Sequence, residues 1–148
     1  MGENPTKEKP KITRLLDNAT TLENYAVHFG NLKMNYITTL KCFREYSGII
    51  VNASPDMVVE YNRRKKLLKI EPVKDDLKGK PRIVTQLMFE AQEGMKIGLG
   101  EADIMLLCTK IGKIYCYDRS SSINILQAAK EIKEIWDSLP VPQVKKAS

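Results

Sequence analysis

Short apolar blocks and longer amphipathic blocks alternate along this chain. The short blocks Gly48 to Val51 and Ile114 to Tyr117 are rich in β-branched or aromatic residues, which is typical of buried strands. Lys11 to Leu16 is interpreted as another strand. Leu68 to Val73 is a further candidate, because its apolar residues alternate imperfectly with polar ones. Buried strands that are separated by helices predict parallel pairing, with helices on both faces of the sheet.

The longer blocks are predicted to be helices, because their apolar residues recur every three or four positions. Ser54 and Pro55 are typical of a helix start, and Gly112 is typical of a helix end. The predicted helices are Thr20 to Tyr46 with a break near Gly30, Met57 to Tyr61, Ile83 to Ile97, Glu101 to Ile111 and Ser121 to Leu139. These elements predict an α/β fold, a three-layer sandwich with a short central parallel sheet.

Composition places these elements in one domain. The chain has 148 residues, of which 43% are hydrophobic, enough for a single core over residues 11–139. Residues 1–10 and 140–148 contain prolines and charges and are expected to be flexible tails. Three cysteines without an evident pairing, and the lack of a signal peptide or long apolar run, predict a cytoplasmic protein with no membrane segment.

Acidic residues lie at the ends or starts of several predicted elements. Asp17 follows the first predicted strand, and Asp118 follows the strand that ends at Tyr117. Glu60 and Glu101 lie within or at the start of predicted helices. Carboxylates at strand ends line the crevice where α/β sheets bind ligands. The sequence therefore predicts that these four carboxylates converge at one edge of the sheet.

The order of these motifs resembles that of the PIN domain, a family of metal-dependent nucleases. Leu15-Leu16-Asp17 followed by Leu22-Glu23-Asn24-Tyr25 is similar to the opening strand and first helix of the family. Ser54-Pro55-Asp56-Met57-Val58-Val59-Glu60-Tyr61 is similar to its second motif, and Gly100-Glu101-Ala102-Asp103-Ile104 to its third. Tyr117-Asp118-Arg119 with Ala128-Ala129-Lys130 resembles its fourth acid and the helix after it.

This resemblance implies a nuclease that hydrolyses phosphodiester bonds, in RNA or alternatively in DNA. The catalytic carboxylates would be those of Asp17, Glu60, Glu101 and Asp118. The cofactor would be Mg²⁺ or Mn²⁺, which prefer oxygen ligands, held by Asp17, Glu101, Asp103 and Asp118. The family also implies a toxin or RNA-processing role, an antitoxin protein as partner of a toxin, and a homodimer.

Charge and the other reactive residues agree with this hypothesis. The net charge of +6 suits a polyanionic partner. The residues expected to hold nucleic acid are Arg63, Arg64, Lys66 and Arg119. The single histidine, His28, is expected to serve ordinary packing, and the cysteines lack the spacing of a zinc site. The carboxylates are therefore the expected catalytic groups.

Two other interpretations remain open. The basic run Arg63 to Lys66 is also typical of the solvated side of a helix. The chain also fits a non-enzymatic dimeric adaptor of the roadblock type, or a nucleic-acid-binding protein with a degenerate metal site. A gain in thermal stability on adding a divalent metal separates an enzyme from an adaptor, because crowded carboxylates repel until a cation binds.

Overall fold

The computed structural model describes residues 5–72 and 79–140, with side chains from residue 16 onward. Its helices are α1 (Pro5–Phe29), α2 (Lys80–Gly94) and α3 (Ile125–Ser138), with short 3-10 helices η1 (Glu101–Asp103) and η2 (Arg119–Ser121). Its strands are β1 (Asn35–Thr38), β2 (Phe43–Tyr46), β3 (Ile49–Asn52), β4 (Met57–Tyr61), β5 (Arg64–Glu71), β6 (Ile104–Cys108) and β7 (Lys113–Cys116). The predicted α/β class is confirmed.

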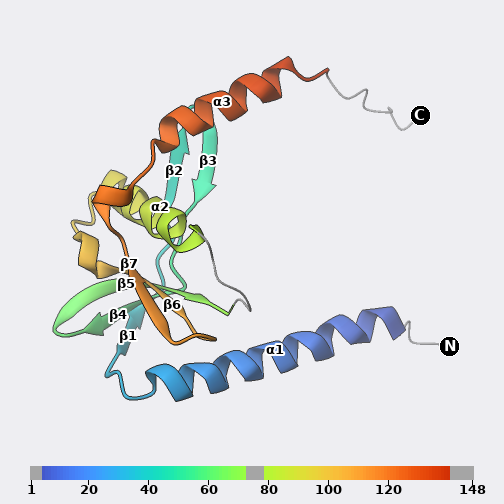
Figure 1. Ribbon diagram of the computed structural model, residues 1–148, viewed down its shortest axis with the longest axis vertical. Coiled ribbons are helices and arrows are strands. Elements are labelled where there is room, and N and C mark those ends of the chain that lie inside the picture. Colours follow the sequence, from blue (N-terminus) through green and yellow to red (C-terminus); the bar gives the residue numbers. More distant parts are fainter. Residues whose placement is uncertain (1–4, 73–78, 141–148) are drawn as a thin grey trace.

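The main sheet is mixed rather than parallel. Its strands lie in the order β1-β4-β5-β6-β7 (Figure 1). Only β5 and β6 pair in parallel, and α2 connects them; the other neighbours are antiparallel. The prediction of a central parallel sheet is therefore wrong for most of the sheet, because two tight hairpins, β4–β5 and β6–β7, reverse the chain where crossover helices were expected.

Helix α2 packs on one face of this sheet, and the C-terminal end of α1 packs on the other (Figure 1). Consecutive residues of a strand point to opposite faces, so each strand contributes to both sides of the core. The α2 side includes the buried residues Val58, Leu67, Met88, Phe89, Ala91 and Ile104. The α1 side consists of the buried residues Phe29, Val59, Leu68, Met105 and Leu107, with partly buried neighbours that include Tyr25.

The second sheet is the antiparallel hairpin β2–β3, and α3 lies beside it (Figure 1). Gln86 of α2 donates to the Ile123 carbonyl at 2.6 Å and accepts from the Ile123 amide at 2.9 Å. The Tyr46 hydroxyl donates to Glu90 of α2 at 3.0 Å. Burial and this bond raise the pKa of Tyr46. These polar contacts fix the hairpin and the start of α3 against α2.

The N-terminal half of the chain is more helical than predicted. Lys11 to Leu16, predicted as a strand, lies inside α1. No glycine or proline interrupts the chain between Lys11 and Phe29, so one helix continues to Gly30. Part of the predicted tail, from Pro5, also belongs to α1, whereas residues 1–4 and 141–148 lie outside the described residues.

Three segments predicted as helices contain strands. Met57 to Tyr61 is β4, because the β-branched pair Val58 and Val59 precedes a turn in which Asn62 and Arg63 have φ of 53° and 62°. Ile104 to Ile111 begins with β6, whose residues are all buried, and Gly112 ends a hairpin turn with φ of 70°. The region from Leu32 to Tyr46 forms β1 and β2 instead of a continued helix.

Several predicted elements are confirmed. Helix α2 occupies most of Ile83 to Ile97, and α3 occupies most of Ser121 to Leu139. Strands β3 and β7 match the two short apolar blocks, and β5 covers Leu68 to Glu71 of the candidate strand Leu68 to Val73. The last residue of that segment, Val73, lies outside the described residues.

Candidate functional site

The amino end of β5 carries an ion cluster, which we call the amino-end cluster: the buried residues Lys66 and Asp103 and the exposed Arg64. Asp103 is 1% exposed and accepts from the Arg64 guanidinium at 3.0 and 2.8 Å. It also accepts from the Gly100 amide at 3.0 Å, and Lys66 Nζ lies 3.4 Å from its carboxylate. Burial alone raises the pKa of Asp103, but the bonds from Arg64 and Gly100 outweigh it, and the pKa is lowered.

This cluster changes the roles expected for its members. Asp103 precedes Ile104, and Lys66 precedes Leu67, the residue with which Ile104 pairs across the parallel strands. The ion pair therefore joins β5 to η1 at the start of the β5–β6 ladder. Asp103, predicted as a metal ligand, already has cationic partners, and Lys66, predicted to bind nucleic acid, is buried. Both side chains contribute to the fold.

The four predicted catalytic acids do not form one site. Asp17 is exposed on α1, and Glu60 is exposed on β4 opposite Lys65 of β5. Across the side chains of residues 16–72 and 79–140, no group of three or more His, Cys, Asp or Glu is placed to hold a metal ion. The predicted convergence is wrong because it requires strand ends at residue 16 and a helix at residue 60, and the structure has a helix and a strand there.

Glu101 and Asp118 are the two predicted acids that the structure brings near each other. Glu101 accepts from the backbone amide of Arg119 at 3.2 Å, and the Arg119 guanidinium lies 3.4 Å from the same carboxylate. Asp118 caps η2 by accepting from the Ser120 amide at 3.0 Å. Glu101 and Arg119 line an open groove of about 610 Å³ whose wall includes Phe89. The contacts of these two acids define the turn at η2 and a surface ion pair.

The carboxyl end of β5 brings together a different set of charges, which we call the carboxyl-end cluster: Asp56, Lys69, Glu71 and Lys80. Asp56 lies just before β4, and its carboxylate accepts from the Ile70 amide at 2.6 Å. Lys69 Nζ lies 3.3 Å from the other Asp56 oxygen. Glu71 ends β5, and its carboxylate lies 3.3 Å from Lys80 Nζ at the start of α2.

The geometry of the sheet explains this assembly. Asp56 lies opposite Lys69 where the β4–β5 ladder continues past Met57 and Leu68, and Glu71 is two positions further along the same face of β5. Asp56 and Lys69 are 38% and 34% exposed at their side chains, so solvent reaches them. The Glu71 carbonyl accepts from the Thr109 amide just after β6, which holds the edge of the parallel pair together.

The amino terminus of α2 faces this edge, because α2 follows β5 and leads to β6. Gly79 caps α2 without a side-chain hydrogen bond, and the first turn contains no acid. It carries Lys80 and Arg82 instead. Uncapped amides, a helix dipole and basic side chains together attract anions. The carboxyl-end cluster thus places carboxylates beside an anion-attracting helix end, at the edge where α/β sheets bind ligands.

The sequence analysis placed Asp56 only within the stretch Ser54 to Tyr61, with Glu60 as its acid, and did not single out Glu71. The available signal was the alternation of Leu68, Ile70 and their charged neighbours, which marks a strand that delivers Glu71 at its end. The role of Asp56 could be predicted only from the pairing of β4 with β5, which brings it beside Lys69. The site therefore depends on strand pairing more than on any local motif.

Two general findings complete the description. No helix within the described ranges is both long and apolar enough to cross a lipid bilayer. Comparison of the chain with protein-family models, with curated proteins and with solved structures finds no match. The carboxyl end of β5 is therefore the feature from which a function is inferred.

Proposed function

We propose that this protein is a divalent-metal-dependent nuclease that hydrolyses phosphodiester bonds, with RNA as its favoured substrate. The observation that carries the proposal is the carboxyl-end cluster, in which Asp56 lies just before β4 and Glu71, at the end of the adjacent β5, contacts Lys80 at the start of α2. The PIN resemblance proposes the same chemistry, with its three-layer fold, but the site argued here stands on the cluster alone.

The donor set fits magnesium or manganese. These ions take oxygen ligands, and magnesium is commonly held by one or two carboxylates together with waters and substrate phosphates. Asp56 and Glu71 supply two carboxylates of this kind. When bound, such a cation supplies charge neutralisation at the phosphoryl oxygens and a more acidic water.

The other residues of the cluster supply binding and positioning. The Lys80 side chain and the backbone amides of Lys80 and Arg82 would hold a phosphate oxygen, because they present positive charge at the start of α2, where Pro81 has no amide hydrogen to donate. Lys69 is held against Asp56 and would place a cation beside the developing negative charge. The three free thiols of the chain fit a reducing compartment such as the cytoplasm.

The test is cleavage of labelled RNA and DNA in magnesium, in manganese and in EDTA. Asp56→Asn and Glu71→Gln are compared with Asp118→Asn and Glu101→Gln, which alter the acids of the predicted motifs. We expect metal-dependent cleavage that the first two variants lose, by about 100-fold or more, and that the second two retain. Loss of cleavage in Asp118→Asn alone would place the site at the predicted motifs, and no cleavage in any metal would contradict the proposal.

A protein-binding adaptor is the second candidate, because α3 exposes most of its apolar side. The exposed apolar residues are Leu126, Ile132, Ile135, Trp136 and Leu139, with 46 to 70% of their surface accessible. A contiguous apolar surface of this kind marks an interaction site. The expected form is a homodimer, and light scattering of wild type and Trp136→Lys measures it: a dimer that the substitution dissociates supports this function.

A further inference from the structure

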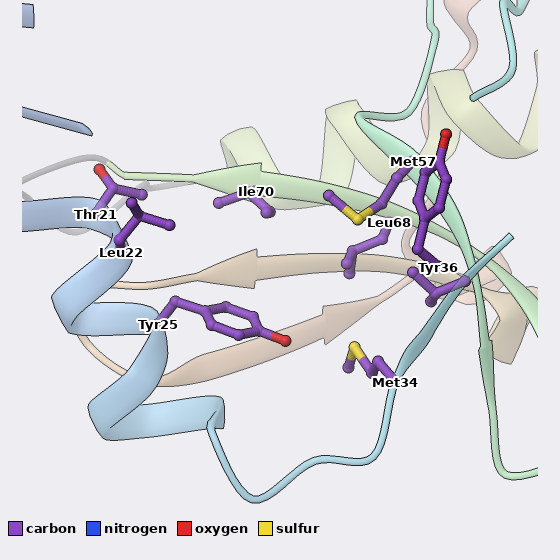
Figure 2. A pocket seen from close by; sticks show the side chains of 9 residues that line it. Thr21, Leu22, Tyr25, Met34, Tyr36, Met57, Leu68 and Ile70 are labelled. Atoms are coloured by element: carbon purple, nitrogen blue, oxygen red, sulfur yellow. The ribbon is translucent and has the colours of Figure 1, made fainter. Parts of the chain in front are cut away.

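A separate pocket lies between α1 and the main sheet, on the face opposite α2 (Figure 2). Its volume is about 280 Å³. Figure 2 shows the Tyr25 ring reaching from α1 across the pocket, with Tyr36 on the far side and Leu68 and Ile70 on the sheet. The walls are therefore apolar, with aromatic rings from two different elements.

The pocket is open to solvent. Phe29 at the end of α1 is 2% exposed and anchors the helix on the sheet, but Leu22, two turns earlier, is 70% exposed. Tyr36 is 63% exposed. Large apolar side chains that line one hollow and still face water mark a binding site rather than a packing fault.

The walls select a flat ligand. Tyr25 and Tyr36 offer ring faces for stacking, and Met57 adds a polarisable thioether. The volume of about 280 Å³ admits one bicyclic ring and leaves no room for a base pair. Unpaired bases are bound in this way, by stacking on aromatic side chains.

The pocket and the carboxyl-end cluster lie at the same end of β5 but on opposite faces of the main sheet, because consecutive strand residues point to opposite faces. Met57 and Ile70 line it, and they are the neighbours of Asp56 and Glu71. The bond from the Ile70 backbone amide to the Asp56 carboxylate, 2.6 Å long, lies at the end of the sheet that both sites share. A nucleic-acid strand whose base occupies the pocket would pass round this end of the sheet to reach the cluster, and the net charge of +6 favours such a polyanion.

We propose that this pocket binds an unpaired base of single-stranded nucleic acid, and so makes single-stranded RNA the substrate class; the choice of RNA rests on the proposed function. The base stacks against Tyr36 and Tyr25 while the sugar-phosphate backbone passes round the carboxyl end of β5 toward Asp56 and Glu71 on the other face. A duplex is excluded from the pocket, because a paired base cannot enter it.

The test is binding of a short fluorescently labelled single-stranded RNA in EDTA, which removes cleavage from the measurement. Tyr36→Ala is expected to weaken binding about tenfold or more, the usual effect of losing one stacked base, and Tyr36→Phe is expected to retain it. Tyr61→Ala, at the other end of β4 and outside the pocket, is the matched control. Because Tyr36 is largely exposed, its substitution leaves the fold intact, which thermal melting verifies.

The outcomes separate this proposal from the nuclease proposal. Tighter binding of the RNA than of an abasic strand, with no cleavage in any metal, supports the base-binding pocket and contradicts only the proposal that the protein is a nuclease. Equal affinity for the RNA and for an abasic strand of the same length overturns the pocket proposal even where cleavage occurs. Binding of dodecanoate that Tyr36→Ala abolishes, with no effect of that variant on RNA, also overturns it and assigns the pocket to an acyl chain.

Discussion

The two ends of strand β5 carry the same kinds of residue in opposite settings. At its amino end, the Asp103 carboxylate is almost fully buried and is surrounded by donors from Arg64, Lys66 and Gly100. At its carboxyl end, Asp56 and Lys69 face solvent beside the uncapped start of α2. A buried, saturated ion pair fixes strand register, whereas an exposed one keeps oxygens available for a ligand. Burial, rather than residue type, thus separates structure from candidate chemistry here.

The largest effect expected from this contrast is on stability at the buried end. Asp103→Ala leaves Lys66 buried without its partner, and such losses destabilise by about 3–5 kcal/mol. Chemical denaturation measures the change in unfolding free energy. Glu101→Ala, two residues away and exposed, is the control and is expected to cost under about 1 kcal/mol. A similar cost for both variants would show that burial does not distinguish them.

Replacing the buried pair by apolar residues sharpens the same point. The double variant Lys66→Met with Asp103→Leu removes both buried charges and fills their volume, while Arg64 is already largely exposed to solvent. We expect it to recover at least about 1 kcal/mol of the loss seen in Asp103→Ala. Denaturation of the three proteins under one condition measures this, and a double variant less stable than Asp103→Ala would contradict it.

Acid should weaken the amino-end cluster. The pKa of Asp103 is lowered in the folded protein, while an unfolded aspartate has a pKa of about 3.9. A lowered folded pKa adds stability that is fully present above the unfolded value and is lost as the pH falls through the folded one. Below about pH 4, wild type should therefore lose unfolding free energy faster than Asp103→Asn. If the unfolding free energies of wild type and Asp103→Asn fall in parallel as the pH is lowered, the Asp103 carboxylate is not a source of acid sensitivity.

The smallest stability effect is expected at the exposed end. Lys80 is 50% exposed at its side chain, so Lys80→Ala should change the unfolding free energy by less than about 1 kcal/mol. The substitution should instead weaken RNA binding and reduce the slope of log affinity against log salt concentration by about one unit, as expected for the loss of one phosphate contact. Lys130→Ala on α3 is the matched control. Equal salt dependence in both variants would mean that Lys80 does not contact the phosphate backbone.

Local sequence correctly predicted the elements whose pattern of apolar residues fits only one type of secondary structure. The amphipathic stretches of α2 and α3 were predicted because their apolar period matches only a helix over that length. The β-branched block of β3 and the aromatic block of β7 were predicted as strands for a similar reason. No long-range contact was needed for these four segments.

Pairing partners decided what the sequence left undetermined. The run from Ile104 to Cys108 is apolar at every position, which suits a helix or a central strand equally, and only β5 and β7 on either side make it a strand. The roles of Asp103 and Glu71 follow from the same pairing, because it buries one carboxylate against Lys66 and delivers the other to the start of α2. The sequence by itself determined which segments are apolar and where charges lie along the chain. The tertiary structure decided which charges meet, since burial and cross-strand neighbours are properties of residues far apart in sequence.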